Sequence, residues 1–224
     1  VLILDYILAN NEHLEDGFVV TSIVTSLLVD KICKYYGVKL YKTYTGFKSI
    51  CEQIEKVLSA QDKNSFIFAF EESCGYFTGD YIRDKDGLQA SLLFASLSAY
   101  LKRENKTVFD RLEEIKDKMG RVYDEQSFHI FNGAKGNSVI KKKMDKLRKT
   151  PPNMIADFEV ENIVDYLKDR KDLGKSNVLE FNLKGGHRLI VRPSGTEPKL
   201  KIYISTINDK SLRKLKKKLM ILIS

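Results

Sequence analysis

The sequence has no long apolar run and few of the residues that bind metals or form disulfides. None of its runs approaches the roughly 18 consecutive apolar residues of a membrane-spanning helix, so we do not expect a membrane protein. Its three cysteines include no C-x-x-C pair, which argues against a disulfide framework and a zinc site and fits a reducing cytoplasm. The histidines lie far apart in the sequence, and we expect them at the surface or in ordinary hydrogen bonds: His13, His129 and His187.

A secretory signal peptide is not expected either. The opening VLILDYILAN is short, carries Asp5, and follows no basic segment. The chain begins at Val1 rather than Met, which suggests a fragment of a longer protein. With 224 residues, of which 43% are hydrophobic and 30% charged, it has the composition of an ordinary globular protein with one large or two small domains.

Positive charge is present in excess, at +8, and gathers in two clusters at 141–149 and 210–218. Such charge favours an anionic partner: nucleic acid, an acidic membrane or a phosphorylated metabolite. In the second cluster, leucines at helical spacing indicate that the lysines form the solvated face of a packed helix. No aromatic residues interleave with either cluster to stack bases, which disfavours nucleic acid.

The first half of the chain alternates apolar strands with amphipathic helices. The pattern predicts strands at 18–21, 38–44 and 66–70, and helices at 23–36, from 47 onward, at 86–102 and after Thr107. Gly37 is placed to cap the first helix. Because the crossovers between these strands are long, we expect an α/β domain with a mainly parallel sheet.

From about Gly120 the pattern changes to short alternating strands with few helices. Strands are predicted at 127–131, 177–183, 188–191 and 199–205, and the turn Lys184–His187 reads as a hairpin. Asp209 suits the N-cap of a last helix. We therefore expect two domains, 1–120 and 121–224, the second a smaller α+β domain with an antiparallel sheet.

The loop EESCGY directly follows the apolar strand at 66–70. In open α/β sheets, ligands bind beyond the carboxyl ends of the strands. If strand geometry continues, Glu71 and Ser73 project to one side and Glu72 to the other. A carboxylate beside a hydroxyl suits a pair of sugar hydroxyls, but a helix-capping or turn cluster explains the same residues equally well.

A second loop, Arg192–Pro198, holds two of the four prolines and many hydrogen-bond donors. An arginine forms bidentate bonds to phosphate oxygens, and successive amides at Ser194, Gly195 and Thr196 can form an anion nest. Lys199 and Lys201 add positive charge nearby. The pattern favours a phosphate site over a plain polar hairpin loop.

Four motifs in this order make the sequence resemble the α-D-phosphohexomutases, the phosphoglucomutase/phosphomannomutase family. They are TGFK (Thr45–Lys48), EESCGY, RDKDG (Arg83–Gly87) and RPSGTEPKLKIY (192–203). The match covers nearly the whole chain. Family members have four domains, and the resemblance implies that 1–120 is the third, which reads the sugar, and 121–224 the fourth, a TATA-binding-protein-like domain that binds phosphate.

The resemblance also implies roles for individual residues. It assigns recognition of the sugar to Thr45, Gly46, Glu71 and Ser73. It assigns recognition of the phosphate to Arg192, Ser194, Gly195, Thr196 and Lys201. Lys85 matches an active-site lysine that is a candidate for proton transfer or phosphate contact, and Lys48 matches a second basic position less closely.

Two parts of the family's machinery have no counterpart in the sequence. The phosphorylated serine belongs to a T-x-S-H-N-like motif, and no Ser-His pair occurs here. The family's Mg²⁺ site is a D-x-D-x-D-R loop, which Asp84-Lys85-Asp86 matches poorly because its central residue is lysine and the third aspartate is missing. We therefore expect both to lie in upstream domains 1 and 2, and the fragment alone to be inactive.

The resemblance thus implies a piece of a cytoplasmic enzyme that interconverts hexose 1-phosphate and hexose 6-phosphate. The expected intermediate and activator is glucose 1,6-bisphosphate, and the expected partner is a phosphorylated hexose, not nucleic acid or membrane. The motifs favour a glucose phosphate over a mannose phosphate as the substrate, and they do not exclude a pentose phosphate. Two other classes also stay open: a non-catalytic phosphosugar-binding module and a basic nucleic-acid-binding protein.

Overall fold

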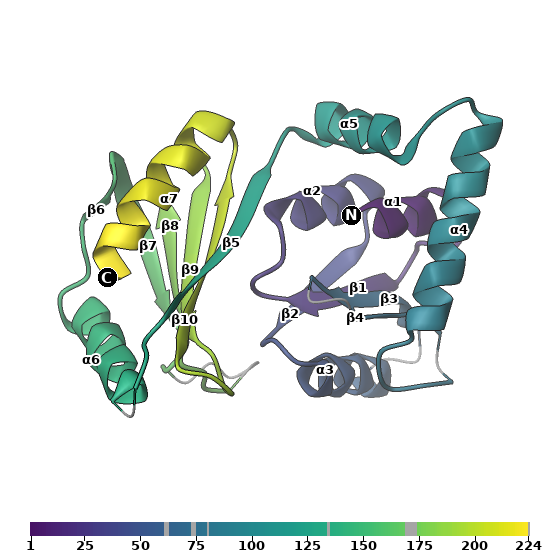
Figure 1. Cartoon of the computed structure of the whole chain (residues 1–224). Coiled ribbons are helices and arrows are strands. Elements are labelled where there is room, and N and C mark those ends of the chain that lie inside the picture. The colour runs from purple at the N-terminus through teal and green to yellow at the C-terminus, as the bar shows by residue number, and fades with distance from the viewer. Residues whose placement is uncertain (61–62, 73–74, 80, 134, 169–173, 224) are drawn as a thin grey trace. The chain divides into compact units, whose positions relative to one another are not determined.

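The computed structural model describes residues 1–60, 63–72, 75–79, 81–133, 135–168 and 174–223. The chain divides into two compact units, Val1–Arg121 and Val122–Ser224 (Figure 1). Each unit has its own sheet and its own hydrophobic core.

Unit 1 is built on a four-stranded sheet in the order β2-β1-β3-β4. β1 pairs in parallel with β2 and with β3, and only the short β4 is antiparallel. This confirms the predicted mainly parallel sheet. The strands are β1 (Gly17–Ser22), β2 (Lys39–Thr43), β3 (Ser65–Glu71) and β4 (Gly75–Phe77). The helices are α1 (Leu2–Ala9), α2 (Leu27–Tyr36), α3 (Phe47–Ala60), α4 (Gly87–Arg103) and α5 (Val108–Met119).

Helices cover both faces of this sheet, with α2 and α3 on opposite sides (Figure 1). Phe18 and Val20 of β1 project to the α3 side, where they pack against Ile50 and Ile54. Val19, between them, is also buried, and so are the last five residues of β3, so both faces of the sheet are covered here. This explains why β3 reads as an uninterrupted hydrophobic run. Gly37 ends α2 with φ of 71°, the left-handed conformation that makes glycine the usual residue there.

Three local features of unit 1 differ from the sequence prediction. α2 begins at Leu27, not at 23, because the Ser26 hydroxyl accepts the N–H of Leu28 as an N-cap. The segment before it is still tied to the sheet, since the Ile23 amide donates to the Thr43 carbonyl at 2.8 Å. α1 and β4 were not predicted.

Unit 2 holds a six-stranded sheet in the order β5-β10-β9-β8-β7-β6. Every pairing that the structure describes in it is antiparallel, as the sequence predicted. Its strands are β5 (Tyr123–Ile130), β6 (Met154–Ile155), β7 (Phe158–Asp165), β8 (Leu179–Leu183), β9 (His187–Pro193) and β10 (Lys199–Thr206). Its helices are α6 (Gly136–Lys149) and α7 (Asp209–Ile223). β6 and β7 were not predicted.

The central strands of unit 2 alternate strictly between two faces. Leu200, Ile202 and Ile204 of β10 lie in the core with Ile140 and Met144 of α6. The residues between them therefore project from the opposite face of the sheet. This alternation determines which side chains of β9 and β10 can meet a ligand.

Two smaller expectations in unit 2 were wrong. The N-cap of α7 is Asn208 rather than Asp209, because the Asn208 carboxamide oxygen accepts the Ser211 amide at 2.8 Å. His187 is buried, with 5% of its surface exposed, and its ring contacts Phe158 edge-on at 4.5 Å. Its Nδ1 has no hydrogen-bond partner in the part of the chain that the structure describes.

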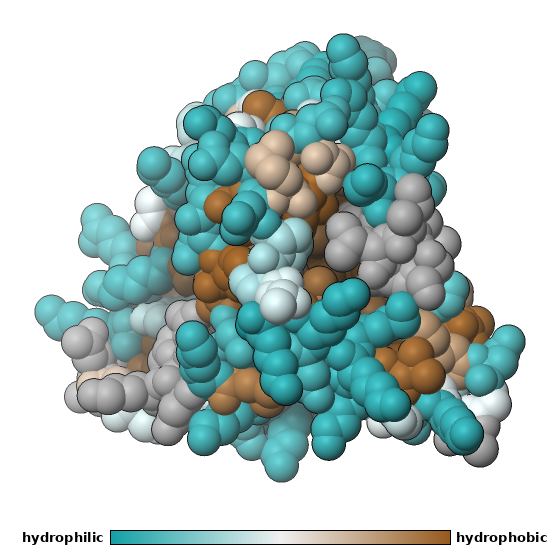
Figure 2. Space-filling model, turned by 90° about the vertical axis from the view of Figure 1, so that its left-hand side faces the viewer, coloured by the Kyte–Doolittle hydropathy of each residue, from teal (hydrophilic) through white to brown (hydrophobic). Residues whose placement is uncertain are grey.

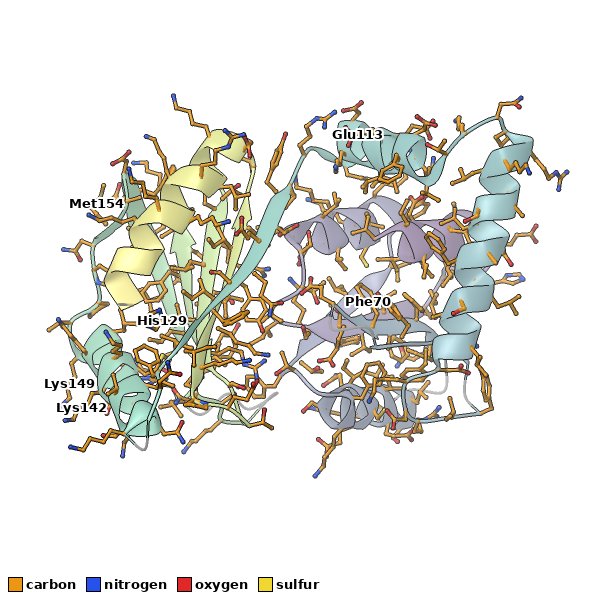
Figure 3. All side chains as sticks on the ribbon, in the orientation of Figure 1. Phe70, Glu113, His129, Lys142, Lys149 and Met154 are labelled. Atoms are coloured by element: carbon orange, nitrogen blue, oxygen red, sulfur yellow. The ribbon has the colours of Figure 1, made fainter. Side chains whose placement is uncertain are left out.

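The basic cluster of α6 lies on the solvated side of a packed helix. Ile140 and Met144 face the core, while Lys142 and Lys149 point away from the body of the unit (Figure 3). On the side of the molecule that Figure 2 shows, hydrophilic residues predominate and the hydrophobic ones form separate patches. Some cations are also paired internally, as in the contact of Lys214 with Asp157 at 2.6 Å. None of the helices described is long and apolar enough to cross a membrane.

Candidate functional site

The first group of candidate residues lies where β2 and β3 end, at one edge of the parallel sheet. Gly46 lies between β2 and α3, directly before the first helical residue Phe47, and its carbonyl accepts the Ser49 amide at 3.0 Å. Its φ of 120° is a conformation that glycine adopts without the strain that a side chain would bring. The sharp turn from strand to helix therefore depends on glycine at this position.

Glu71, the last residue of β3, is buried against this turn. Its Oε1 accepts the Gly46 amide at 2.6 Å, which places a negative charge at the N-terminus of α3. Only 8% of Glu71 is exposed. The bond uses one carboxylate oxygen, and the second oxygen retains its capacity to accept hydrogen bonds.

Glu72 points to a different helix. Its Oε1 accepts the Ser26 amide at 2.7 Å, at the N-terminus of α2. Because α2 and α3 cover opposite faces of the sheet, consecutive glutamates project to opposite sides, as the strand alternation predicted (Figure 1). Both carboxylates serve as helix caps, the alternative explanation that the sequence left open. Ser73 lies outside the described residues.

The lysines predicted from the motifs line a pocket of about 860 Å³ beside Gly46. Lys85 packs its ammonium over the Phe47 ring, 4.9 Å from the centroid, and lies 2.9 Å from Asp84. Lys48 is largely exposed and is 3.9 Å from Glu52. Thr45 is half-buried beside Gly46 but does not line the pocket.

The pocket carries charges of both signs. Lys48, Arg83 and Lys85 face Glu52, Glu55 and Asp84 in its lining. The Lys85 ammonium and amide both donate to Asp84, which lowers the pKa of that carboxyl. Donors and acceptors in close alternation suit a ligand with several hydroxyl groups.

The acidic residues of α3 were missed at the level of sequence. Lys48, Glu52 and Glu55 follow at helical spacing, so they share the face of α3 that lines the pocket. Arg83 Nε donates to Glu55 at 2.5 Å, and the Cys51 thiol donates to the Arg83 carbonyl at 3.2 Å. These contacts fasten the RDKDG segment to α3. The helical spacing could have indicated that Lys48, Glu52 and Glu55 share a face, but not that Arg83 meets it.

The same segment does not fit a Mg²⁺ site. Asp84 is engaged by the Lys85 ammonium. Asp86 caps α4 by accepting the Gln89 amide at 2.9 Å, and it also accepts the Tyr81 hydroxyl. Across the residues that the structure describes, no three His, Cys, Asp or Glu side chains are grouped for a metal ion.

The second group of candidate residues surrounds the turn between β9 and β10 in unit 2. Arg192 and Lys201 are register partners in the antiparallel pair, so they lie directly opposite each other on the face away from the core. Like charges in that position are destabilising. Within the described ranges of the chain, neither cation has a carboxylate within ion-pair distance.

The turn itself holds Ser194, Gly195 and Thr196, and the last two are exposed. The Ser194 amide donates to the Lys199 carbonyl at 2.8 Å, so it is not free for an anion as the sequence suggested. The hydroxyl of Ser194 and the amides of Gly195 and Thr196 remain as donors. Lys199, by contrast, is paired with Glu197 at 2.7 Å and lies over the Phe128 ring.

Family comparisons agree with this division into two units. The phosphoglucomutase/phosphomannomutase alpha/beta/alpha domain III model matches residues 1–119, and the C-terminal domain model of the same family matches residues 139–222. The chain belongs to the phosphoglucomutase/phosphomannomutase family. The predicted resemblance is therefore confirmed.

Individual members of the phosphoglucomutase/phosphomannomutase family align along most of the chain. A phosphoglucomutase from Staphylococcus haemolyticus is 34% identical over 215 residues, and one from Staphylococcus aureus strain N315 is 35% identical over the same length. Each alignment covers 91% of this chain but 38% of the relative. The chain thus spans less than half the length of these relatives.

Solved structures of the family share the fold. A putative phosphomannomutase from Thermus thermophilus aligns with a TM-score of 0.66 at 16% identity, over 99% of this chain and 39% of that one. Parafusin, a phosphoglucomutase from Paramecium, aligns with a TM-score of 0.67 at 22% identity, with the same coverage.

Proposed function

We propose that this chain is the sugar- and phosphate-binding part of a longer phosphohexomutase that interconverts hexose 1-phosphate and hexose 6-phosphate. Support comes from the two matched family models and from relatives of which the chain spans 38%. The observation that carries the proposal is the pair Arg192 and Lys201. No carboxylate of the described residues lies within ion-pair distance of either, and two cations held opposite each other in this way are stabilised when an anion binds between them.

In this proposal the phosphate that is not reacting binds at the turn of unit 2. The Arg192 guanidinium and Lys201 ammonium neutralise its charge, while Ser194, Gly195 and Thr196 donate to its oxygens. Prolines at both ends of the turn limit its motion. Donors fixed in advance stabilise anionic oxygens without reorganising during the reaction.

The sugar hydroxyls bind at the edge of the sheet in unit 1. Glu71 accepts hydrogen bonds from them, the turn at Thr45 and Gly46 lets the ring approach the backbone, and Ser73 adds a hydroxyl. Lys85 is placed to contact phosphate or to transfer a proton at the reacting hydroxyl, with Lys48 as a further cation. Since the ammonium of Lys85 is held by Asp84 and Phe47, it is oriented before substrate arrives.

The phosphoryl donor is a phosphoserine in the part of the longer protein that precedes this chain. Its phosphoryl group moves to the free hydroxyl of the hexose monophosphate and gives a bisphosphate. The sugar reorients, and the other phosphate returns to serine. A Mg²⁺ ion held by residues of that preceding part would neutralise charge on the transferred group.

Titration of the purified chain with glucose 6-phosphate, glucose 1,6-bisphosphate and glucose tests the proposal. We expect binding of both phosphosugars, none of glucose, and protection of residues 192–201 from hydrogen exchange. A 20-mer oligonucleotide serves as the competing ligand. Salt-dependent binding of the oligonucleotide, with no binding of phosphosugar, would favour the nucleic-acid alternative instead.

A further inference from the structure

The exposed side of β5 changes from polar to apolar along its length. Its exposed residues alternate with partly buried ones, and they are Asp124, Gln126, Phe128 and Ile130. The first two are polar, as expected on the solvated side of the strand at the edge of a sheet. Phe128 and Ile130 are large and apolar, yet they are 51% and 45% exposed. Single exposed apolar residues are common, but two neighbours on one face point to a contact made there.

This apolar end of β5 lies beside the proposed phosphate site. Lys201 of β10 is the register partner of Phe128 on one side and of Arg192 on the other. Register partners project from the same face of a sheet, with Cβ atoms about 5 Å apart. Arg192, Lys201 and Phe128 therefore form one row across β9, β10 and β5, hereafter the cation–aromatic row.

A second row on the same face has a different composition. Arg188, Ser205 and Asp124 are register partners across the same three strands. The Ser205 hydroxyl accepts from the Arg188 guanidinium at 3.5 Å and donates to the Asp124 carboxylate at 2.6 Å. That row thus contains both a cation and an anion. In the cation–aromatic row the β5 position holds the phenyl ring of Phe128 instead of a carboxylate.

The ring of Phe128 is held on one side only. The Lys199 ammonium lies 4.9 Å from the ring centroid, and Lys199 is also paired with Glu197 at 2.7 Å. These contacts restrict the ring while half of the residue stays exposed on the face that carries Arg192. The cation–aromatic row therefore presents two cations and an oriented, accessible aromatic surface side by side.

We propose that Phe128 binds the ring of the phosphorylated sugar whose phosphate is held by Arg192 and Lys201. The inference rests on the proposed function and deepens it, because it names a residue that distinguishes a phosphosugar from free phosphate. Binding sites commonly combine an apolar or aromatic wall with a few polar groups that fix the orientation of the ligand.

The electrostatics of the cation–aromatic row determine which part of the ligand lies where. The face of an aromatic ring carries negative charge, so it disfavours phosphate but attracts the slightly positive C–H groups of a sugar ring. The phosphate therefore lies over the two cations, and the sugar extends toward Phe128. The spacing is suitable, since neighbouring strands lie about 5 Å apart, close to the width of a hexose ring.

The test is a titration of the 224-residue chain with inorganic phosphate and with glucose 6-phosphate, followed by NMR. We expect Phe128→Ala to weaken binding of glucose 6-phosphate about fivefold, in the range of an aromatic contact, and to leave inorganic phosphate unchanged. Phe128→Tyr keeps the aromatic face and should retain the parental affinity for both ligands. Phe109→Ala is the matched control, since it removes a phenyl ring of unit 1 that is 76% exposed, and it should affect neither ligand.

Phe128→Leu covers the case in which Phe128→Ala does not fold. It keeps an apolar side chain but lacks the aromatic face, so it should weaken glucose 6-phosphate alone while thermal melts stay near those of the parent. Equal weakening of both ligands would mean that the ring acts by holding Lys199 near the phosphate, and this would overturn the sugar contact. Parental affinity for glucose 6-phosphate in Phe128→Leu would overturn it as well.

Arg192→Ala separates this inference from the proposed function. If Arg192→Ala loses both ligands while Phe128→Leu binds as the parent does, the sugar contact alone is wrong. If Phe128→Leu weakens glucose 6-phosphate while Arg192→Ala binds as the parent does, the phosphate assignment alone is wrong. A parent chain that binds neither ligand would overturn both.

Discussion

At the scale of single residues, Arg192 offers the sharpest test of the phosphate site. Its planar guanidinium can donate two parallel bonds to one phosphate, and the ammonium of lysine cannot. We expect Arg192→Lys to weaken binding of glucose 1,6-bisphosphate about tenfold, and Arg192→Ala by about 10- to 150-fold, since a charged hydrogen bond contributes about 1.5–3 kcal/mol. Calorimetric titration measures both.

Lys199→Ala is the control for Arg192. Lys199 has the same charge and lies in the same turn, but it is already paired with Glu197 and covered by Phe128. We expect Lys199→Ala to weaken binding of glucose 1,6-bisphosphate less than threefold, because surface substitutions usually change free energies by no more than about 0.5 kcal/mol. Thermal melts of all variants should agree with the parent. Equal losses for Lys199→Ala and Arg192→Ala would mean that net charge, not the Arg192 fork, holds the ligand.

His187 predicts a pH dependence of stability in unit 2. Burial lowers its pKa below the ordinary value of about 6.5. The unfolded chain therefore binds a proton more readily than the folded one, so His187 destabilises the fold as the pH falls through 6.5 toward the folded-state pKa. Urea denaturation should show that the free energy of unfolding falls less between pH 8 and pH 5.5 in His187→Gln than in the parent. An identical loss in both proteins would rule His187 out as the cause.

At the scale of elements, the two glutamates after β3 separate capping from recognition. Gln keeps an oxygen that accepts the same backbone amide but loses the charge near the helix N-terminus, which costs about 0.3–1 kcal/mol. Glu71→Gln and Glu72→Gln should therefore lower the stability of unit 1 to a similar extent. Only Glu71→Gln should also reduce kcat/KM of the longer enzyme, by about tenfold or more.

Denaturation and steady-state kinetics on both variants provide the measurement. Since Glu72 acts as the matched control, its kinetics should stay near those of the parent. Equal kinetic losses would show that Glu71 acts through the helix it caps and has no direct part in sugar binding.

A buried ion pair joins the first and last helices of unit 1. Arg111 of α5 donates to Asp5 of α1 at 2.7 Å, and Asp5 is 1% exposed. The Tyr36 hydroxyl donates to the same carboxylate at 3.0 Å, and burial together with Asp5 raises the pKa of Tyr36 to about 12. Arg111→Met should destabilise the chain by about 3 kcal/mol because it leaves the buried Asp5 carboxylate without a counter-charge.

Denaturant unfolding measures the stability lost in Arg111→Met, and two further variants serve as controls. The double variant Asp5→Leu/Arg111→Met should recover most of the stability, since a well-packed apolar pair replaces the charges. Arg121→Met removes exposed ion pairs with Glu113 and Asp117 and should cost less than about 1 kcal/mol. A large loss in Arg121→Met would indicate that the ion pairs of α5 act as one network.

Most elements followed from periodicity, and several of those missed have physical reasons. β4 and β6 contain three and two residues, too few for a pattern to emerge. α1 is a short apolar segment that fits a strand or a helix, and its one acidic residue, Asp5, is paired with Arg111, 106 residues away, which the sequence pattern cannot show. The α2 boundary was wrong because Ile23 and Val24 are buried by the sheet rather than by a helix.

At the scale of the whole molecule, the candidate sites were predictable from motifs but their supports were not. The sequence pointed to Gly46, Glu71, Lys85 and Arg192. It did not show that Glu71 also caps α3, or that Glu55 of α3 fastens the segment carrying Lys85. Such contacts join residues 25 and 28 positions apart, and only the fold determines them.

The chain by itself should not interconvert sugar phosphates. Phosphoryl transfer needs a donor and a charge-neutralising metal, and we expect both in the preceding part of the longer protein. A coupled assay with glucose 1-phosphate and added glucose 1,6-bisphosphate should stay at background while both sugars still bind. Turnover that persists through a second purification would contradict the expectation that the donor and the metal lie outside this chain.

The alternation of β10 constrains how the family can vary this site. The same eight residues supply Leu200, Ile202 and Ile204 to the core and Lys201 to the opposite face, where we propose that phosphate binds. Deletion of one residue inside the strand would exchange the two sets, burying a lysine and exposing an isoleucine. Substitutions can therefore change the ligand preference here, whereas insertions and deletions within the strand would also disrupt the core. We expect related sequences to differ in composition but not in length between Lys199 and Thr206.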